Sequence, residues 1–226
     1  MTMPRKSSKP RLVKKRIVIV DDHPMTRLGL SQLLNGEPDL VVCGEAESAA
    51  AGFSVILDAS PDLVLVDISL PGKSGLELIK DVHAVNPAIP MLVISMHSES
   101  IYAERSLSAG SRGYVMKNES GETVISAIRT VLAGGIAVSE KVSTRVLQNL
   151  CPTTSVHQTG VNTLTNREFE IFQLIGEGLA TAKIAKKLNI ATKTVHSHLA
   201  AIRPKLGKSS MPELIACAAT WAASQG

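Results

Sequence analysis

Five side chains that could bind or accept a phosphoryl group stand at the ends of short apolar runs in the first half of the chain. They are the carboxylates of Asp21, Asp22 and Asp67, the hydroxyl of Ser95 and the ammonium of Lys117. Three carboxylates in one place repel one another unless one takes up a proton or a cation lies among them, and an all-oxygen set suits a hard ion such as Mg²⁺. A hydroxyl and an ammonium suit phosphoryl oxygens. These residue types indicate phosphoryl transfer to a carboxylate with Mg²⁺ as cofactor.

The segments that would position these residues alternate between two periodicities. Apolar runs of strand length, rich in β-branched residues, occupy 16–20, 40–43, 62–66, 91–95 and 112–116. Helix-length segments occupy 25–35, 48–57, 74–85, 100–109 and 121–132. This alternation predicts an α/β domain with a doubly wound five-stranded parallel sheet. Because crossovers are right-handed, the carboxyl ends of all strands reach one edge of the sheet, where we expect the five residues to lie.

Three stretches of this half form a recognisable set with Ser95, namely 18–23 (VIVDDH), 65–75 (LVDISLPGKSG) and 113–117 (GYVMK). Through them residues 17–132 resemble the receiver domain of bacterial two-component response regulators. The resemblance implies that Asp67 is the phosphoacceptor. It also implies that Asp21, Asp22, Asp67 and the backbone carbonyl of Ser69 hold Mg²⁺.

The same resemblance assigns two further roles near the phosphoacceptor. Ser95 and Lys117 are similar to the pair that senses the phosphoryl group, and Tyr114 is similar to the aromatic switch residue of receiver domains. A tyrosine at position 114 is equally compatible with a buried core residue. The implied source of the phosphoryl group is a sensor histidine kinase.

Charge is distributed unevenly along the chain. Residues 1–16 hold seven Lys or Arg and no acid, residues 17–134 hold seven against fifteen acids, and residues 135–226 hold ten against five. The acidic first half and basic second half predict two domains with different partners, the second of them a candidate for nucleic acid. The basic residues at the N-terminus are interpreted as a flexible solvated tail, 1–15, rather than a DNA-binding arm.

Short helices with capping signals predict a helix-turn-helix in the second half. A capping box at Thr165 and Glu168 begins a helix that should run to about Gly176. Thr181 and Thr192 are predicted to cap the next two helices, the last of which should end at Leu206. A further helix is expected within 139–150 and another at 212–223, and residues 151–162 have the composition of a linker.

The third of these helices is the candidate for contact with DNA. Val195, Leu199, Ile202 and Leu206 form one apolar stripe, which leaves a basic and polar face outside. The stretches 164–168 (LTNRE), 175–179 (IGEGL), 193–198 (KTVHSH) and 205–207 (KLG), with Ile184-Ala185, resemble the DNA-binding domain of LuxR-type regulators. The resemblance and the major-groove geometry of this fold place His196, Ser197 and Ala200 nearest the bases and Lys193, Thr194 and Lys205 on phosphates.

Two residues of this helix, His198 and Pro204, are not assigned to the DNA-facing surface. His198 lies beside the apolar stripe and is interpreted as structural. Pro204 removes a backbone donor from the last turn of the helix and puts the direction of Lys205 in doubt.

The chain as a whole resembles a NarL/FixJ-class response regulator. We expect a receiver domain at 16–135, a linker at 136–161 and an all-α helix-turn-helix domain at 162–226, acting in the bacterial cytoplasm as a transcription regulator rather than an enzyme. Promoter DNA and a second copy of the chain are the expected partners, because pairing on two half-sites supplies affinity that one small domain lacks. Two alternatives are an aspartate-dependent phosphatase and a quorum sensor with a ligand-binding N-terminal domain. The three scattered cysteines form neither a disulfide framework nor a metal-ligand spacing, their odd count leaves at least one free thiol, and all three are interpreted as small apolar packing residues.

Overall fold

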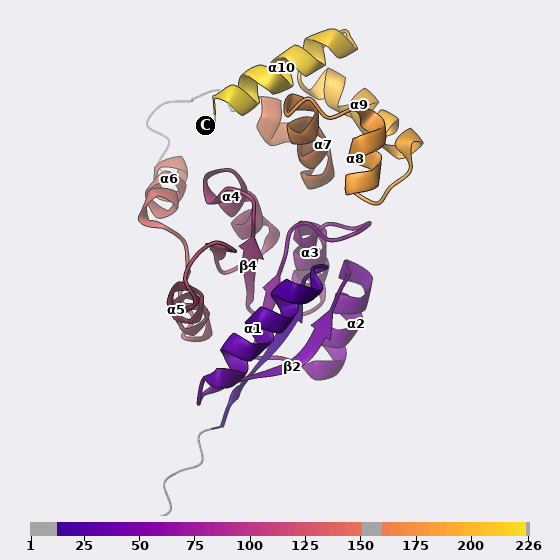
Figure 1. Ribbon diagram of the computed structural model, residues 1–226. Coiled ribbons are helices and arrows are strands. Elements are labelled where there is room, and N and C mark those ends of the chain that lie inside the picture. The colour runs from indigo at the N-terminus through magenta and orange to yellow at the C-terminus, as the bar shows by residue number, and fades with distance from the viewer. Residues whose placement is uncertain (1–12, 151–159, 225–226) are drawn as a thin grey trace, which may run out of the picture.

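The computed structural model describes residues 13–150 and 160–224 (Figure 1). Most of the predicted tail and residues 151–159 of the predicted linker, Cys151 included, lie outside these ranges. The other two cysteines, Cys43 and Cys217, are free and partly buried. No described helix has both the length and the apolar character needed to cross a membrane.

The predicted parallel sheet is confirmed. Its five strands are β1 (Lys15–Val20), β2 (Leu40–Ala46), β3 (Leu63–Val66), β4 (Met91–Ser95) and β5 (Tyr114–Met116). They lie in the order β2-β1-β3-β4-β5, so the winding direction changes between β1 and β3 and opens a crevice at their carboxyl ends. The sheet takes in Lys15, which the charge pattern assigned to the tail, and the Lys15 ammonium is 2.9 Å from Asp62 Oδ1.

Helices cover both faces of the sheet, as doubly wound folds require. Helices α1 (Pro24–Gly36) and α5 (Gly121–Leu132) cover one face, and α2 (Ala49–Ala59), α3 (Gly75–Val85) and α4 (Glu99–Ala109) cover the other. Successive strand residues therefore enter different cores. In β1, Ile17 and Ile19 pack with the α1 and α5 side chains, and Val18 and Val20 pack with those of α2 and α3.

The C-terminal domain is helical. A short 3-10 turn (Gly160–Thr163) precedes α7 (Asn166–Gly176), α8 (Thr181–Lys187), α9 (Thr192–Lys205) and α10 (Met211–Ala223). The capping box of Thr165 with Glu168 is present, but the predicted caps at Thr181 and Thr192 are wrong. Ala180 and Ala191 occupy those N-cap positions without a side-chain hydrogen bond, so each threonine is the first residue inside its helix.

Helix α9 has the predicted inner stripe. Val195, Leu199 and Ile202 are buried, and the partly buried Leu206 packs against the same core. Pro204 lies inside the helix, which ends at Lys205, one residue before the predicted end.

Helix α6 (Glu140–Leu150), expected from the sequence, connects the two halves and packs along α4. Val142 is buried there, and Arg145 pairs with Glu104 and donates to the Ser100 carbonyl. One side of α4 is therefore covered by the segment that leads to the C-terminal domain.

Candidate functional site

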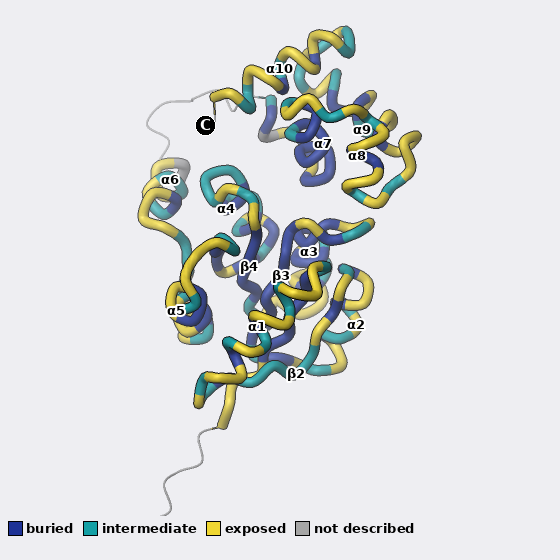
Figure 2. The backbone as a smooth tube through the Cα atoms, in the orientation of Figure 1, coloured by how far each residue is buried: buried dark blue, intermediate teal, exposed yellow. Residues whose placement is uncertain are grey.

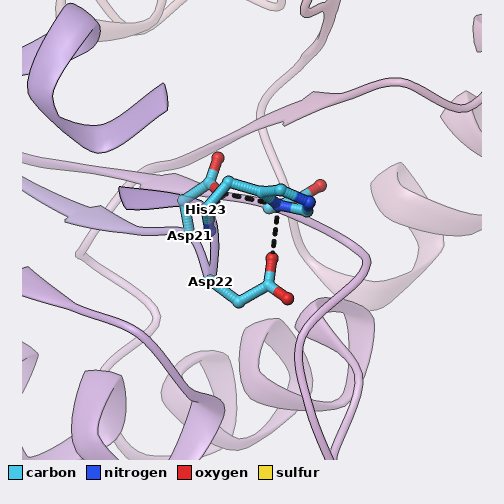
Figure 3. Close-up of side chains that lie close together, drawn as sticks. Asp21, Asp22 and His23 are labelled. Atoms are coloured by element: carbon cyan, nitrogen blue, oxygen red, sulfur yellow. Dashed lines mark hydrogen bonds and ion pairs between the residues drawn. The ribbon is translucent and has the colours of Figure 1, made fainter. Parts of the chain in front are cut away.

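The carboxyl ends of β1 and β3 bring the three aspartates together. One ligand atom from each of Asp21, Asp22, His23 and Asp67 lies within 4.8 Å of every other. Backbone hydrogen bonds fix their positions, since Asp67 N donates to the Val20 carbonyl (2.8 Å) and Asp21 N to the Ala46 carbonyl (3.0 Å). Figure 3 shows His23 beside Asp22, and His23 Nδ1 is 2.6 Å from Asp22 Oδ1. His23 was not among the residues predicted from the sequence to belong to this cluster.

Lys117 supplies the cation that the carboxylate cluster requires. Its Nζ is 2.6 Å from Asp21 Oδ2 and 2.8 Å from Asp67 Oδ2, and its backbone N–H donates to the Ser95 carbonyl (2.9 Å). Burial acts to lower the pKa of the Lys117 ammonium, but the charges and hydrogen bonds of Asp67 and Asp21 outweigh burial and hold that pKa above its ordinary value. The ammonium therefore stays charged and offsets part of the repulsion.

The remaining oxygens of the cluster suit a divalent cation. Asp67 Oδ1 is buried and has no hydrogen-bond partner among the residues that the structure describes. Burial raises the pKa of the Asp22 carboxyl, and the nearby charges of Asp67 and Asp21 raise it further, against the opposing effect of His23. A hard cation would satisfy the unpaired oxygen and relieve this repulsion, so the residues present fit Mg²⁺.

Ser95 and Tyr114 meet at the start of the β4–α4 loop. The buried Ser95 hydroxyl accepts a hydrogen bond from His97 N (3.3 Å), and the Tyr114 hydroxyl donates to the His97 carbonyl (2.8 Å). Tyr114 is 2 % exposed, and burial raises its pKa. In this conformation Tyr114 is a core residue, and its role as a switch stays a prediction.

The β4–α4 loop, helix α4 and helix α7 carry site residues that were not predicted from the sequence. His97 Nε2 lies 2.9 Å from Ser69 Oγ, and the His97 ring lies 4.7 Å from the Tyr102 ring, centroid to centroid. From the C-terminal domain, Arg167 donates to the Gly72 carbonyl (3.0 Å) and Gln173 accepts from the Tyr102 hydroxyl. The spacing of Tyr102 and Arg105 places them on one face of α4, which is the only signal in the sequence for these contacts. It does not reveal which residues, distant in sequence, pack against that face.

The residues predicted to contact DNA lie mostly on one exposed face of α9. Lys193, Thr194, His196, Ser197 and Ala200 are exposed.

Lys205 is oriented differently from this group. Its Nζ lies 2.6 Å from Glu168 Oε2 on α7, so this cation is already paired. His198 is partly buried and burial lowers its pKa, in agreement with a structural role.

Comparison with known proteins identifies the family. The family described as response regulator receiver domain matches residues 17–129, and the family described as bacterial regulatory proteins, luxR family, matches residues 162–218. The chain is 33% identical over 205 residues to the oxygen regulatory protein NreC of Staphylococcus carnosus, covering 88% of this chain and 94% of NreC. This chain is a response regulator with a LuxR-type DNA-binding domain. Such a regulator is a phosphorylation-dependent transcription regulator, and the receiver match leaves no room at 17–129 for the ligand-binding domain of a quorum sensor.

Solved structures of response regulators share this architecture. A LuxR-family response regulator from Aurantimonas sp. SI85-9A1 is 31% identical, with a TM-score of 0.56, over 61% of this chain and 99% of that one. RcsB from Salmonella enterica serovar Typhimurium, solved bound to promoter rprA in the presence of the phosphomimetic BeF3⁻, is 25% identical, with a TM-score of 0.58, over 89% of this chain and 96% of that one.

Proposed function

We propose that this response regulator accepts a phosphoryl group on Asp67 from a sensor histidine kinase and thereby controls binding of its C-terminal domain to promoter DNA. The observation that carries the proposal is the buried Asp67 carboxylate, with one oxygen on Lys117 and the other unpaired. The unpaired Oδ1 would face the cation, and Oδ2, which Lys117 releases to a phosphoryl oxygen, is the nucleophile that bonds to phosphorus. The neighbouring carboxylates of Asp21 and Asp22 supply the negative charge that a divalent cation needs.

In this proposal Asp21, Asp22, Asp67 and the Ser69 carbonyl would hold Mg²⁺, which would supply positive charge to the phosphoryl oxygens. Lys117 then exchanges Asp67 Oδ2 for a phosphoryl oxygen with little movement, because its ammonium already lies 2.8 Å from the carboxylate.

Ser95 and Tyr114 would carry the signal away from the phosphoacceptor. The Ser95 hydroxyl turns to a phosphoryl oxygen and gives up its bond from His97 N, which frees the β4–α4 loop. Tyr114 holds the same loop through the His97 carbonyl and rearranges with it.

The DNA-binding surface would consist of the exposed face of α9. Lys193 and Thr194 contact phosphates, and His196, Ser197 and Ala200 lie nearest the bases. Lys205 reaches a phosphate only after leaving Glu168, so its contribution is smaller than that of Lys193. We also propose that the protein acts in the cytoplasm and binds two DNA half-sites as a homodimer. The domain boundaries predicted from the sequence remain part of this proposal.

The experiment is intact-mass measurement after incubation with acetyl phosphate and Mg²⁺. The parent protein and an Asp58→Asn control, at an exposed position of helix α2, should each gain one acid-stable, base-labile phosphoryl group, and Asp67→Asn should gain none. Labelling of Asp67→Asn to the parent level would remove Asp67 from the mechanism.

A further inference from the structure

His23 stands at the carboxyl edge of the sheet, and the proposed phosphoryl transfer gives its side chain no role. It occupies the N-cap position of α1 but makes no capping hydrogen bond with its side chain. At the starts of α2, α3 and α5, by contrast, Ser48, Ser74 and Ser120 each accept a hydrogen bond from a backbone N–H. The imidazole of His23 instead lies against the aspartates that precede it (Figure 3). Helix capping therefore does not account for a histidine at this position.

A ring nitrogen of His23 faces carboxylate oxygens. Its Nδ1 lies 2.6 Å from Asp22 Oδ1 and 3.4 Å from Asp21 Oδ1. Within 13–150 and 160–224, the cluster of these three residues with Asp67 is the one group of at least three His, Cys, Asp or Glu side chains close enough to share an ion, with ligand atoms at most 4.8 Å apart. Two ligands that each lie about 2.1 Å from one ion are at most about 4.2 Å apart. The ligand atoms therefore need to approach one another by no more than about 0.6 Å.

A buried oxygen in this cluster lacks a partner. Asp67 is 2 % exposed, and its Oδ1 has no hydrogen-bond partner among the described residues. The Lys117 ammonium pairs with the other oxygen of Asp67 and with Asp21 Oδ2. Three carboxylates and one ammonium leave two negative charges without a counter-charge, and burying unpaired charge is costly. A divalent cation would balance these charges and satisfy the unpaired oxygen.

Burial decreases step by step along the loop that leads from β1 to α1. The side chains of Asp21, Asp22 and His23 are 0%, 33% and 63% exposed. Figure 2 shows the same change on a larger scale, because β3 and β4 are buried whereas most of α1 is exposed or partly exposed. An ion from solvent therefore meets the imidazole first and the buried carboxylates last.

We infer that this cluster binds a late first-row transition cation of the class of Zn²⁺, with His23 Nδ1 as a ligand beside the three carboxylates. An all-oxygen set favours Mg²⁺, whereas an imidazole ligand raises the affinity for Co²⁺, Ni²⁺, Cu²⁺ and Zn²⁺. The neutral ring binds through the Nδ1 lone pair and keeps its hydrogen on Nε2. The inference goes beyond the proposed phosphoryl transfer and does not require that Asp67 accepts a phosphoryl group.

The two kinds of ion compete for the same oxygens. Asp22 and Asp67 belong both to this ligand set and to the proposed Mg²⁺ site, so one ion excludes the other. Only the transition cation uses the His23 nitrogen, because Mg²⁺ takes oxygen ligands. Loss of the imidazole therefore separates the two affinities.

Isothermal titration calorimetry of the full-length protein tests the site, with Zn²⁺ and Mg²⁺ titrated separately. His23→Gln removes the ring nitrogen, and His83→Gln, at an exposed position of α3, is the matched control. Asp67→Asn removes a carboxylate that both ions share. The three cysteines are present in every variant, so zinc bound by thiols contributes equally to all. Thermal melts without metal verify that each variant is folded.

We expect His23→Gln to raise the Kd for Zn²⁺ roughly tenfold or more and to leave the Kd for Mg²⁺ within about twofold of the parent value. His83→Gln should change neither affinity, and Asp67→Asn should weaken Zn²⁺ binding. Parental Zn²⁺ affinity in His23→Gln, or an equal loss for both ions, would overturn the assignment of His23 as a ligand. Parental Zn²⁺ affinity in Asp67→Asn would overturn the shared site. Failure of the parent to bind Mg²⁺ would contradict the proposed Mg²⁺ site instead, and the zinc results would still stand.

Discussion

Gly75 lies where the turn that follows Asp67 enters α3, and replacing it with alanine should displace Asp67. A Cβ atom at Gly75 would lie 1.9 Å from the Asp67 carbonyl oxygen and 2.8 Å from its carbonyl carbon. Ordinary contact begins at 3.4 Å, so the two backbones must separate by about 1.5 Å. The Gly75 N–H also donates to the Ile68 carbonyl (2.9 Å), which ties the shift to the whole turn.

The cost follows from which atoms must move. Strain from an added methyl group in a packed site is about 1–3 kcal/mol and exceeds this where backbone is displaced, whereas alanine in a helix recovers at most about 1 kcal/mol over glycine. We expect a net loss of roughly 2 kcal/mol and a Tm lower by roughly 5–10 °C. Labelling of Asp67 by acetyl phosphate should fall more than tenfold, because the carboxylate leaves Lys117.

Gly29→Ala in α1 is the matched control, since nothing lies within 4 Å of its added methyl group. It should raise stability by up to about 1 kcal/mol and leave labelling unchanged. Thermal melts of both variants measure the change in Tm, and intact-mass measurements after incubation with acetyl phosphate measure the labelling of Asp67. Gly75→Ala with parental Tm and parental labelling would show that the turn absorbs the methyl group and that the 1.9 Å contact does not constrain Asp67.

Three further predictions concern the C-terminal domain. Lys193→Ala should weaken binding to all DNA sequences alike and reduce the slope of log K against log salt by about one unit, whereas Lys205→Ala should change the slope less because Glu168 already pairs with it; equal slopes for the two variants would contradict this. Pro204→Ala should restore a backbone donor inside α9, increase the free energy of unfolding by about 1 kcal/mol and so raise the Tm. A lower Tm would show that the proline is favourable there. Burial, opposed by Arg167, raises the pKa of Glu170 to about 7, above its ordinary 4.5, so the stability it contributes is complete below pH 4.5 and is lost as the pH rises through 7. Urea unfolding between pH 5 and pH 8 should show this decline in the parent and a flatter profile for Glu170→Gln, and parallel profiles would mean that Glu170 does not titrate in this range.

The sheet and the clustering of the aspartates at its carboxyl edge were predictable because they depend on local periodicity and one topological rule. Strand-length apolar runs ending in Asp21, Asp67 and Ser95 determine which side chains share an edge, whatever the details of packing. The β2 strand extends past its predicted end because Val18 to Val20 of β1 pair with Gly44 to Ala46, after a register shift that skips Cys43. Gly44 and Glu45 interrupt the apolar run, so the apolar pattern does not reveal this part of the strand.

Contacts between helices distant in sequence were not predictable in the same way. The pairing of Lys205 with Glu168 depends on how α7 crosses α9, and the Tyr102–Gln173 bond depends on where the second domain rests. The capping errors at Thr181 and Thr192 have a local cause. A threonine one residue inside a helix resembles a capping threonine in sequence, and the alanine before it gives no signal.

The aromatic chain that crosses the domain boundary ends on the only tryptophan of the sequence, Trp221. Its ring lies 5.3 Å from that of Phe169, which in turn lies 5.4 Å from the ring of Tyr102 on the receiver side. Trp221 is thus an intrinsic fluorophore close to a tyrosine that belongs to the other domain. Separation of the domains would move Tyr102, the energy donor, away from Trp221 and change the surroundings of Phe169. The fluorescence of Trp221 would therefore report separation of the two domains in real time, without an added label.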